Sequence, residues 1–291
     1  MSTKCKPYII LLASCMLLGV SGLFAKIITL PAEVIITGRS LVAVAILFPF
    51  FYLQRSKVAI RSKRHVFWMF CVGVLMAAHW VTFYTAIKIS SVAIGVIGVF
   101  LHPILSTLLE PIFTKKSFKW IEGWFCVVVI LGVTLIASKD YNGINVVPGL
   151  SVGIMSALCM TFRNIIIRNI NQSFNAMEMM FYQNFITVMI LVGFNADALF
   201  AASFKNLALV AIVGITSSTI GHTLLVKSLE YLTATTVGIL SSFQIIYAAV
   251  LAWAILNEPI TMEIAVGGSM ILYVIIHQLL VGENREVVGS G

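Results

Sequence analysis

RSKVAIRSKRH, residues 55–65, carries five Lys or Arg residues and separates two long apolar runs. A transmembrane helix needs about 20 apolar residues, and the chain, 60% hydrophobic and 10% charged, holds ten runs of roughly this length. We place them at residues 7–25, 32–53, 66–87, 91–113, 119–138, 147–168, 176–194, 206–227, 233–256 and 261–281. Continuous apolar runs indicate helices, because the strands of a membrane barrel alternate polar and apolar residues. The sequence therefore predicts an all-α polytopic membrane protein with ten transmembrane helices.

Basic residues gather in every second gap between these runs. With both termini taken as cytoplasmic, most of the 19 Lys and Arg residues fall on that side: Lys4, Lys6, Arg55, Lys57, Arg61, Lys63, Arg64, Lys115, Lys116, Lys119, Arg168, Lys227 and Arg285. The other side receives Lys26, Lys88, Lys139 and Lys205. This is the positive-inside pattern, which also accounts for the net charge of +8 without a nucleic-acid partner. The expected location is a bacterial inner membrane, crossed many times, with both termini in the cytoplasm.

Targeting and cofactor signals are weak. The first apolar run is long for a signal peptide and is followed by Lys26 rather than a small-residue cleavage site, so a retained first helix is expected. The five cysteines show no CxxC or CxxH spacing, so we expect no metal site and no cofactor. Residues 284–291 are expected to form a tail, and their Gly-Ser-Gly end is typical of an added linker.

The chain repeats itself at a nearly constant offset. The offset is 145 from Glu33 to Glu178 and 141 from Val72 to Val213. We therefore expect two five-helix halves, residues 1–140 and 141–283. Because five is odd, the second half is expected to be inverted relative to the first. Inverted repeats are typical of transporters, with the substrate site at the repeat interface near the midplane.

Local motifs in both halves resemble one family. In the first half they are Gly38-Arg39 in the second run, His79-Trp80 through Tyr84 to Lys88 and then Ser91 around the turn between the third and fourth runs, and Pro103 in the fourth run. In the second half they are Leu251 through Pro259 (LAWAILNEP) in the ninth run and Gly267 in the tenth. Together with ten spans in two halves, they resemble the EamA-type carriers of the drug/metabolite transporter superfamily. One departure is Thr114-Lys115-Lys116, which stands where the acidic end Asn257-Glu258 would recur. The two halves are therefore not expected to be equivalent.

The resemblance implies a secondary transporter that works by alternating access. Export of amino acids or of amphipathic metabolites and drugs is expected, with protons as the candidate coupling ion and the lipid bilayer as surroundings. The alternative is an antiporter or importer of an anionic metabolite such as a nucleotide conjugate. That substrate would need several cations facing one cavity, and only Arg39 and Arg163 lie inside spans, at opposite expected depths. An enzyme is not expected, because GxSxG and HExxH motifs are absent.

Polar groups inside spans are candidate functional residues, because an ionised side chain there costs about 2.5–3.5 kcal/mol on insertion scales. Arg39 is expected to bind a substrate carboxylate or to hold the outer half together. His79 and His222 fall close to each other under the repeat, and a histidine pair could couple protons. The alternative for each histidine is a structural hydrogen bond between helices.

Aromatic and amide side chains complete the expected cavity, since aromatic walls suit amphipathic solutes and cations. The expected substrate-binding set is Arg39, His79, Trp80, Tyr84, His102, Tyr182, Asn184, His222, Ser242, Gln244 and Tyr247. Arg163 and Glu178 are expected to form an ion pair at the cytoplasmic gate, and Glu110 is a further gate candidate or a plain helix-end charge. The pair Gly149-xxx-Gly153 predicts tight packing of the sixth helix.

Overall fold

The computed structural model describes residues 6–54, 63–90, 92–114, 119–137, 146–170, 175–256 and 260–288. The first half contains α1 (Lys6–Ile27), α2 (Ala32–Gln54), α3 (Lys63–Ile89), α4 (Val92–Val99), α5 (His102–Thr114) and α6 (Trp120–Ala137). The second contains α7 (Val146–Ile170), α8 (Ala176–Phe200), α9 (Phe204–Val213), the π-helix η3 (Gly214–Gly221), α10 (His222–Ser228), α11 (Ala234–Ser241), α12 (Phe243–Leu256) and α13 (Met262–Val288). These described residues contain no strand.

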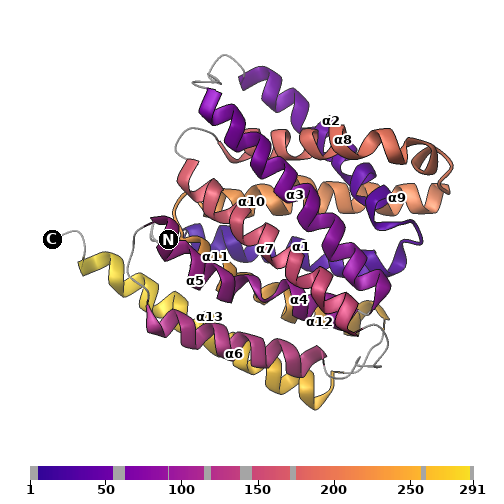
Figure 1. Ribbon diagram of the computed structural model, residues 1–291. Helices are drawn as coiled ribbons and strands as arrows, with labels where there is room; N and C mark the ends of the chain where they lie inside the picture. The colour runs from indigo at the N-terminus through magenta and orange to yellow at the C-terminus, as the bar shows by residue number, and fades with distance from the viewer. Residues whose placement is uncertain are drawn as a thin grey trace.

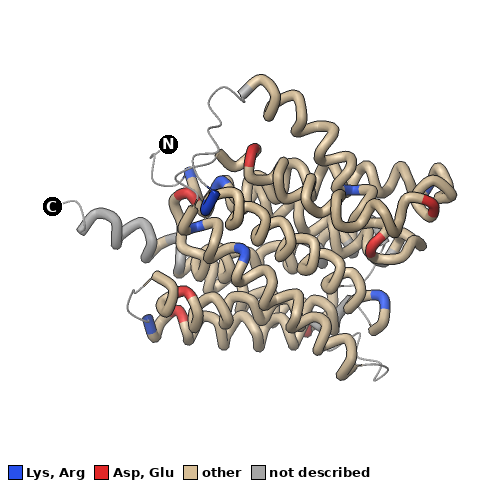
Figure 2. The backbone as a smooth tube through the Cα atoms, turned by 45° about the horizontal axis from the view of Figure 1, so that its top comes forward, with Lys and Arg blue, Asp and Glu red and all other residues tan. Residues whose placement is uncertain are grey.

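The predicted ten spans are present. Seven helical segments are long and apolar enough to cross a membrane, and three shorter apolar segments cover residues 120–136, 234–247 and 262–277. The first residues of α1 and the last of α13 lie at the same end of the molecule (Figure 1). Most Lys and Arg residues gather toward that end, and few charged residues lie in the middle (Figure 2). The prediction of an all-α polytopic membrane protein is confirmed.

Some predicted details differ or cannot be compared. α13 continues to Val288, so the first residues of the expected tail at 284–291 are helical. Residues 138–145, which hold the expected boundary between the halves, lie outside the described residues, as do Lys115-Lys116, Ser91, Asn257-Glu258-Pro259 and residues 289–291.

Three spans are interrupted rather than continuous. The fourth turns at Phe100 and Leu101 between α4 and α5, and the ninth turns at Ser242 between α11 and α12. The eighth passes through η3, where the backbone N–H of His222 donates five residues back to Ser217. Single π-turns inside helices are frequent at functional sites.

The two halves pack through matched pairs of helices. In the first half α3 and α4 pack against α7 of the second, and in the second half η3, α10 and α12 pack against α1 of the first. Equivalent spans also meet directly, as α2 with α8, α5 with α11, and α6 with α13. Figure 1 shows the α6–α13 pair at one edge of the bundle and α2 with α8 at the opposite edge.

Backbones approach closely where glycines face each other. A Cβ added to Gly98 of α4 would lie 2.6 Å from the Cα of Gly153 in α7. A Cβ added to Gly149 would meet the side chain of Ser90, so the predicted tight packing of the sixth span is confirmed. A groove of about 470 Å³ lies between α6 and α13, at the edge of the bundle. It is lined by Val128, Ala265, Val266, Ser269, Met270 and Tyr273.

Candidate functional site

Buried polar side chains gather between the two halves of the bundle. They come from α1, α2 and α3 of the first half and from α7, α8, η3 and α10 of the second: Ser21, Arg39, His79, Tyr84, Ser156, Arg163, Asn164, Gln183, Asn184, Ser217, Ser218 and His222. In an apolar bundle such groups must find hydrogen-bond partners inside the protein. We call this set the central polar cluster.

Arg39 is fully buried and is held from the side of η3 by two adjacent serines. Its Nε–H donates to Ser218 Oγ over 2.6 Å, and its terminal Nη2 donates to Ser217 Oγ over 2.9 Å. A Cβ added to Gly214, at the start of η3, would lie 3.0 Å from the Arg39 carbonyl oxygen. The close approach of η3 to α2 therefore brings both hydroxyls onto one guanidinium.

The other terminal nitrogen of Arg39 faces α1 and α3. Nη1 donates to Tyr84 Oη over 3.1 Å and to Ser21 Oγ over 3.3 Å, and these two hydroxyls are 2.8 Å apart. The guanidinium carbon lies 4.7 Å from the ring centroid of Trp80, a cation–π distance. A guanidinium has five N–H donors, and four of those of Arg39 are used by neutral hydroxyls. Arg39 thus joins four helical segments and has no carboxylate partner among the described residues.

His222 receives a hydrogen bond from the first half. Trp80 Nε1–H donates to His222 Nε2 over 3.1 Å, and the two rings meet edge to face. Nε2 must therefore carry the lone pair, which places the proton of the neutral ring on Nδ1. That Nδ1 is buried without a hydrogen-bond partner among the described residues.

The expected pairing of His79 with His222 does not occur. Ser156 Oγ donates to the His79 carbonyl oxygen over 3.0 Å, and His79 Nδ1 lies 2.9 Å from Ser156 Oγ and 3.1 Å from the Ser156 carbonyl oxygen. Since that carbonyl can only accept, Nδ1 is the donor. Each histidine therefore joins two helices through neutral hydrogen bonds.

The expected ion pair between Arg163 and Glu178 does not form either. Arg163 Nε–H donates to Gln183 Oε1 over 2.7 Å, Nη1 donates to Asn164 Oδ1 over 2.8 Å, and Nη2 lies 3.5 Å from Met180 Sδ. Gln183 lies more than one helical turn deeper in α8 than Glu178, so Arg163 points toward the interior rather than toward the end of the bundle. Glu178 Oε1 is buried and has no hydrogen-bond partner among the described residues.

The two guanidinium groups have separate partners. Arg39 donates to hydroxyls of α1, α3 and η3, whereas Arg163 donates to amide oxygens of α7 and α8. The opposite depths expected for the two arginines stay a prediction.

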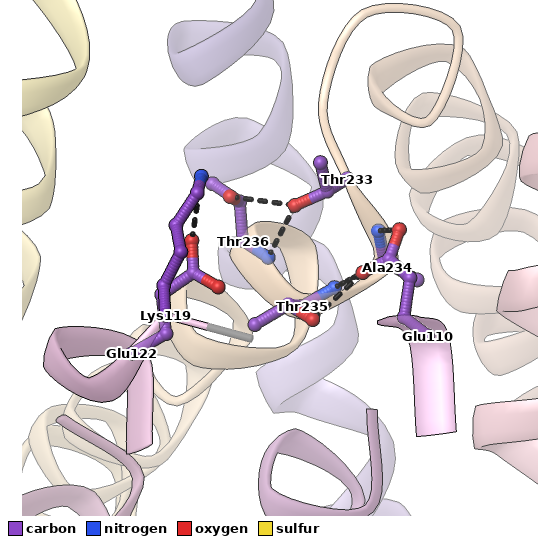
Figure 3. A network of polar contacts seen from close by, with 7 residues as sticks. All are labelled: Glu110, Lys119, Glu122, Thr233, Ala234, Thr235 and Thr236. Carbon is purple, nitrogen blue, oxygen red and sulfur yellow. Dashed lines mark hydrogen bonds and ion pairs between the residues drawn. The ribbon is translucent and has the colours of Figure 1, made fainter. Parts of the chain in front are cut away.

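Glu110 binds the first turn of a helix in the other half. Its carboxylate accepts from the backbone N–H of Ala234 over 3.0 Å, and from the N–H and hydroxyl of Thr235, each over 2.7 Å. Figure 3 shows this contact on one side of the turn and the Lys119–Glu122 pair on the other. A carboxylate at a helix N-terminus accepts from N–H groups that have no partner within the helix, and its negative charge interacts favourably with the positive end of the helix dipole. We call this contact the Glu110 latch.

The remaining candidate residues either lie apart from the central polar cluster or form a hydrogen bond within their own span. Tyr182 is half-buried and packs edge-on against Phe51, while Ser242 donates to the carbonyl of Ile239 in its own span. Gln244 and Tyr247 are half-buried on α12. No hydrogen bond between described residues joins these four to Arg39 or Arg163.

His102 and Asn184 are placed differently. His102 lies at the crossing of spans four and nine, where a Cβ added to Gly238 would lie 3.3 Å from its ring and 3.2 Å from Pro103 Cα. Asn184 is fully buried beside Gln183, and its Nδ2 donates to the carbonyl of Met180.

Sequence reasoning missed several partners of the charged groups. They are Ser21, Ser156, Asn164, Ser217 and Ser218. The run Thr216-Ser217-Ser218-Thr219 is a polar interruption of an apolar span, and this signal could have identified the serines that hold Arg39.

Comparisons with known proteins address the fold and the family of the chain. A search of curated proteins returns no match. A solved structure described only as a protein crystal structure superposes with a TM-score of 0.79, covering 97% of this chain and 99% of its own at 14% identity, and likeness at that identity shows the fold alone. The model of the EamA-like transporter family matches twice, over residues 6–138 and 147–277. Two such matches cover nearly the whole chain, so this protein is a membrane transporter that belongs to the EamA-like transporter family.

Proposed function

We propose that the two halves are inverted repeats and that the protein moves a small solute by alternating access past the central polar cluster. The observation that carries this proposal is that both halves supply the cluster. Arg39, Trp80 and Tyr84 of the first half meet Ser217, Ser218 and His222 of the second. A site made by both halves can be exposed to either side when the halves rock about it.

The interrupted spans four and nine supply the movable parts. At the end of the bundle where both termini lie, α5 and α11 pack together and the Glu110 latch joins them. Beyond the crossing at Pro103 and Gly238, α4 packs against α7 while α12 packs against α1. We infer that the protein is closed at the latch end, and that this end faces the cytoplasm, because the excess of Lys and Arg lies on that side.

The charges of the cluster favour solutes with an anionic group. Two buried guanidiniums have no carboxylate partner among the described residues, and Trp80 offers an aromatic face beside Arg39. We infer that amino acids or amphipathic carboxylates are exported from the cytoplasm of a bacterial cell across its inner membrane. Transport of a larger anionic metabolite, such as a nucleotide conjugate, is the second candidate, because two arginines are buried in the bundle.

We assign the histidines to hydrogen bonding rather than to proton transfer. A proton on His222 Nε2 would place a second donor against the donating Nε1–H of Trp80. The guanidinium carbon of Arg39 lies 4.7 Å from the ring centroid of Trp80, which is the donor to His222, and like charge opposes a further proton on that histidine.

Exchange in liposomes tests the proposal directly. Purified protein in liposomes loaded with an unlabelled amino acid should accumulate the labelled form from outside. In a variant without its native cysteines, Glu110→Cys and Thr235→Cys are introduced together and joined by a short bifunctional thiol reagent. The link should stop exchange, because the latch end can no longer open. Cleaving the linker should restore exchange. Undiminished exchange in the linked protein would contradict alternating access through this end.

A second experiment measures the latch alone. Glu110→Gln removes the negative charge and keeps one acceptor, and hydrogen bonds to charged groups are worth about 1 kcal/mol more than neutral ones. We expect Ser106→Cys, one turn deeper on α5, to react about tenfold faster with a water-soluble maleimide in the Glu110→Gln background. Glu122→Gln, which loses the ion pair on the other side of the same turn, should leave the rate unchanged. Equal rates in all three backgrounds would rule out a latch at Glu110.

A further inference from the structure

The two buried arginines differ in how many of their donors are satisfied. Arg39 uses four of its five N–H donors on hydroxyl oxygens. Arg163 makes three contacts, and one of them is to a thioether sulfur, which is a weak acceptor. Two of the five donors of Arg163 therefore have no acceptor among the described residues, although the side chain is fully buried.

Unpartnered polar atoms also surround Arg163. Asn164 accepts from Arg163 through Oδ1, but its Nδ2 has no partner. Asn184 follows Gln183 on α8, and its Oδ1 has no partner. These two side chains are fully buried, so their unpaired atoms are costly unless something else binds them.

The unpaired atoms are of complementary kinds. The spare donors of Arg163 and the amide N–H groups of Asn164 suit a carboxylate, which accepts several hydrogen bonds and binds guanidinium through two parallel bonds. Asn184 Oδ1 is an acceptor and suits an ammonium group. A solute that carries both groups on one carbon would satisfy both kinds of atom at once.

We propose that Arg163, and not Arg39, binds the carboxylate of a zwitterionic α-amino acid, with Asn164 as a second donor and Asn184 accepting from the α-ammonium group. This assignment rests on the proposed transport function and adds the residues that bind the solute and the orientation of the solute between them. Arg39 then holds the helices around the site, while Arg163 is left with free donors for the solute. The pair Arg163 and Asn164 is the substrate-recognition element of α7.

Binding to matched ligand pairs tests the assignment. Purified protein in detergent is titrated with each L-amino acid and with the corresponding α-amide, which keeps the ammonium group and loses the negative charge. The wild type should bind the best acid about 10- to 100-fold more tightly than its amide, the range expected for charge-assisted hydrogen bonds. Arg163→Gln should remove this preference, and Arg163→Lys should restore part of it.

Matched variants separate recognition from folding. Arg168→Gln lies on the same helix and loses bonds to the carbonyls of Leu229 and Glu230 at the helix end, so it should keep the preference for the acid. If Arg163→Gln is not monodisperse, Asn164→Leu should lower the preference in the same direction.

The outcomes distinguish the two proposals. If the acid is still preferred in Arg163→Gln, or in Asn164→Leu where Arg163→Gln does not fold, the assignment to Arg163 is wrong and the transport function stands. If wild-type protein binds no amino acid and exchanges none in liposomes, the proposed substrate class fails, and this assignment fails with it.

Discussion

Gly153→Leu should prevent the protein from folding into a stable bundle. The Cβ of any residue at this position would lie 2.8 Å from the Cα of Gly98, and a Cβ at Gly98 would lie 2.6 Å from the Cα of Gly153. Both obstructing atoms belong to backbone, so no side-chain rotation relieves the clash. Overpacking of a core costs about 1–3 kcal/mol where side chains can shift, and here we expect about 3 kcal/mol or more.

The measurement is the fraction of detergent-solubilised protein that elutes as one monodisperse peak, together with its melting temperature. Gly193→Leu on α8 is the matched control, because no atom lies within 4 Å of a Cβ added there. Gly193→Leu should elute like the wild type while Gly153→Leu aggregates. A monodisperse Gly153→Leu protein with an unchanged Tm would show that α4 and α7 do not pack as closely as described.

Arg39→Leu should destabilise the protein more than it changes solute recognition. The substitution leaves Ser217, Ser218 and Tyr84 without the donors that join them to α2, and each unsatisfied buried group costs about 1–3 kcal/mol. We expect a total loss of about 3 kcal/mol, which corresponds to a Tm lower by about 6–12 °C. Arg39→Lys should recover only part of this loss, because an ammonium cannot reproduce the planar fork.

Tyr84→Phe measures how much one hydroxyl contributes to the loss of Tm expected for Arg39→Leu. It removes one hydroxyl that contacts Arg39 and Ser21 and should lower the Tm by about a third as much as Arg39→Leu. In the surviving Arg39→Lys protein, the preference for acid over amide should persist. An unchanged Tm in Arg39→Leu would mean that the guanidinium does not hold these helices together.

The sequence was sufficient to predict the spans, because length and hydropathy alone determine which segments can cross a membrane. It did not predict the interruptions in the fourth, eighth and ninth spans. Pro103 is visible in the sequence, but it stands near the start of α5, where proline is tolerated, and the turn precedes it. The turn at Ser242 and the π-helix at Gly214–Gly221 depend on tertiary packing.

The site was predictable in its residues more than in its contacts. Burial of Arg39, Trp80 and His222 in one cluster follows from the rule that polar groups inside spans face the bundle interior. The partner of Glu110 lies 124 residues away in Ala234, and neither side of that contact carries a motif. The ion pair expected between Arg163 and Glu178 is absent. The prediction relied on both residues lying near the ends of neighbouring helices, and that position does not determine the direction in which a long side chain extends.

Fixed positive charge in the middle of the bundle also bears on leakage of ions. A carrier that let protons or Na⁺ slip through would dissipate the electrochemical gradient of its membrane. A monovalent cation about 8 Å from one guanidinium meets a repulsion of about 2 kcal/mol at an effective dielectric constant of about 20, and Arg39 and Arg163 are both fully buried in the bundle. Arginines in the narrow part of a pathway exclude cations in this way. The transport proposed above would therefore pass neutral or anionic solutes while the interior of the bundle remains an insulator against the ions that energise the cell.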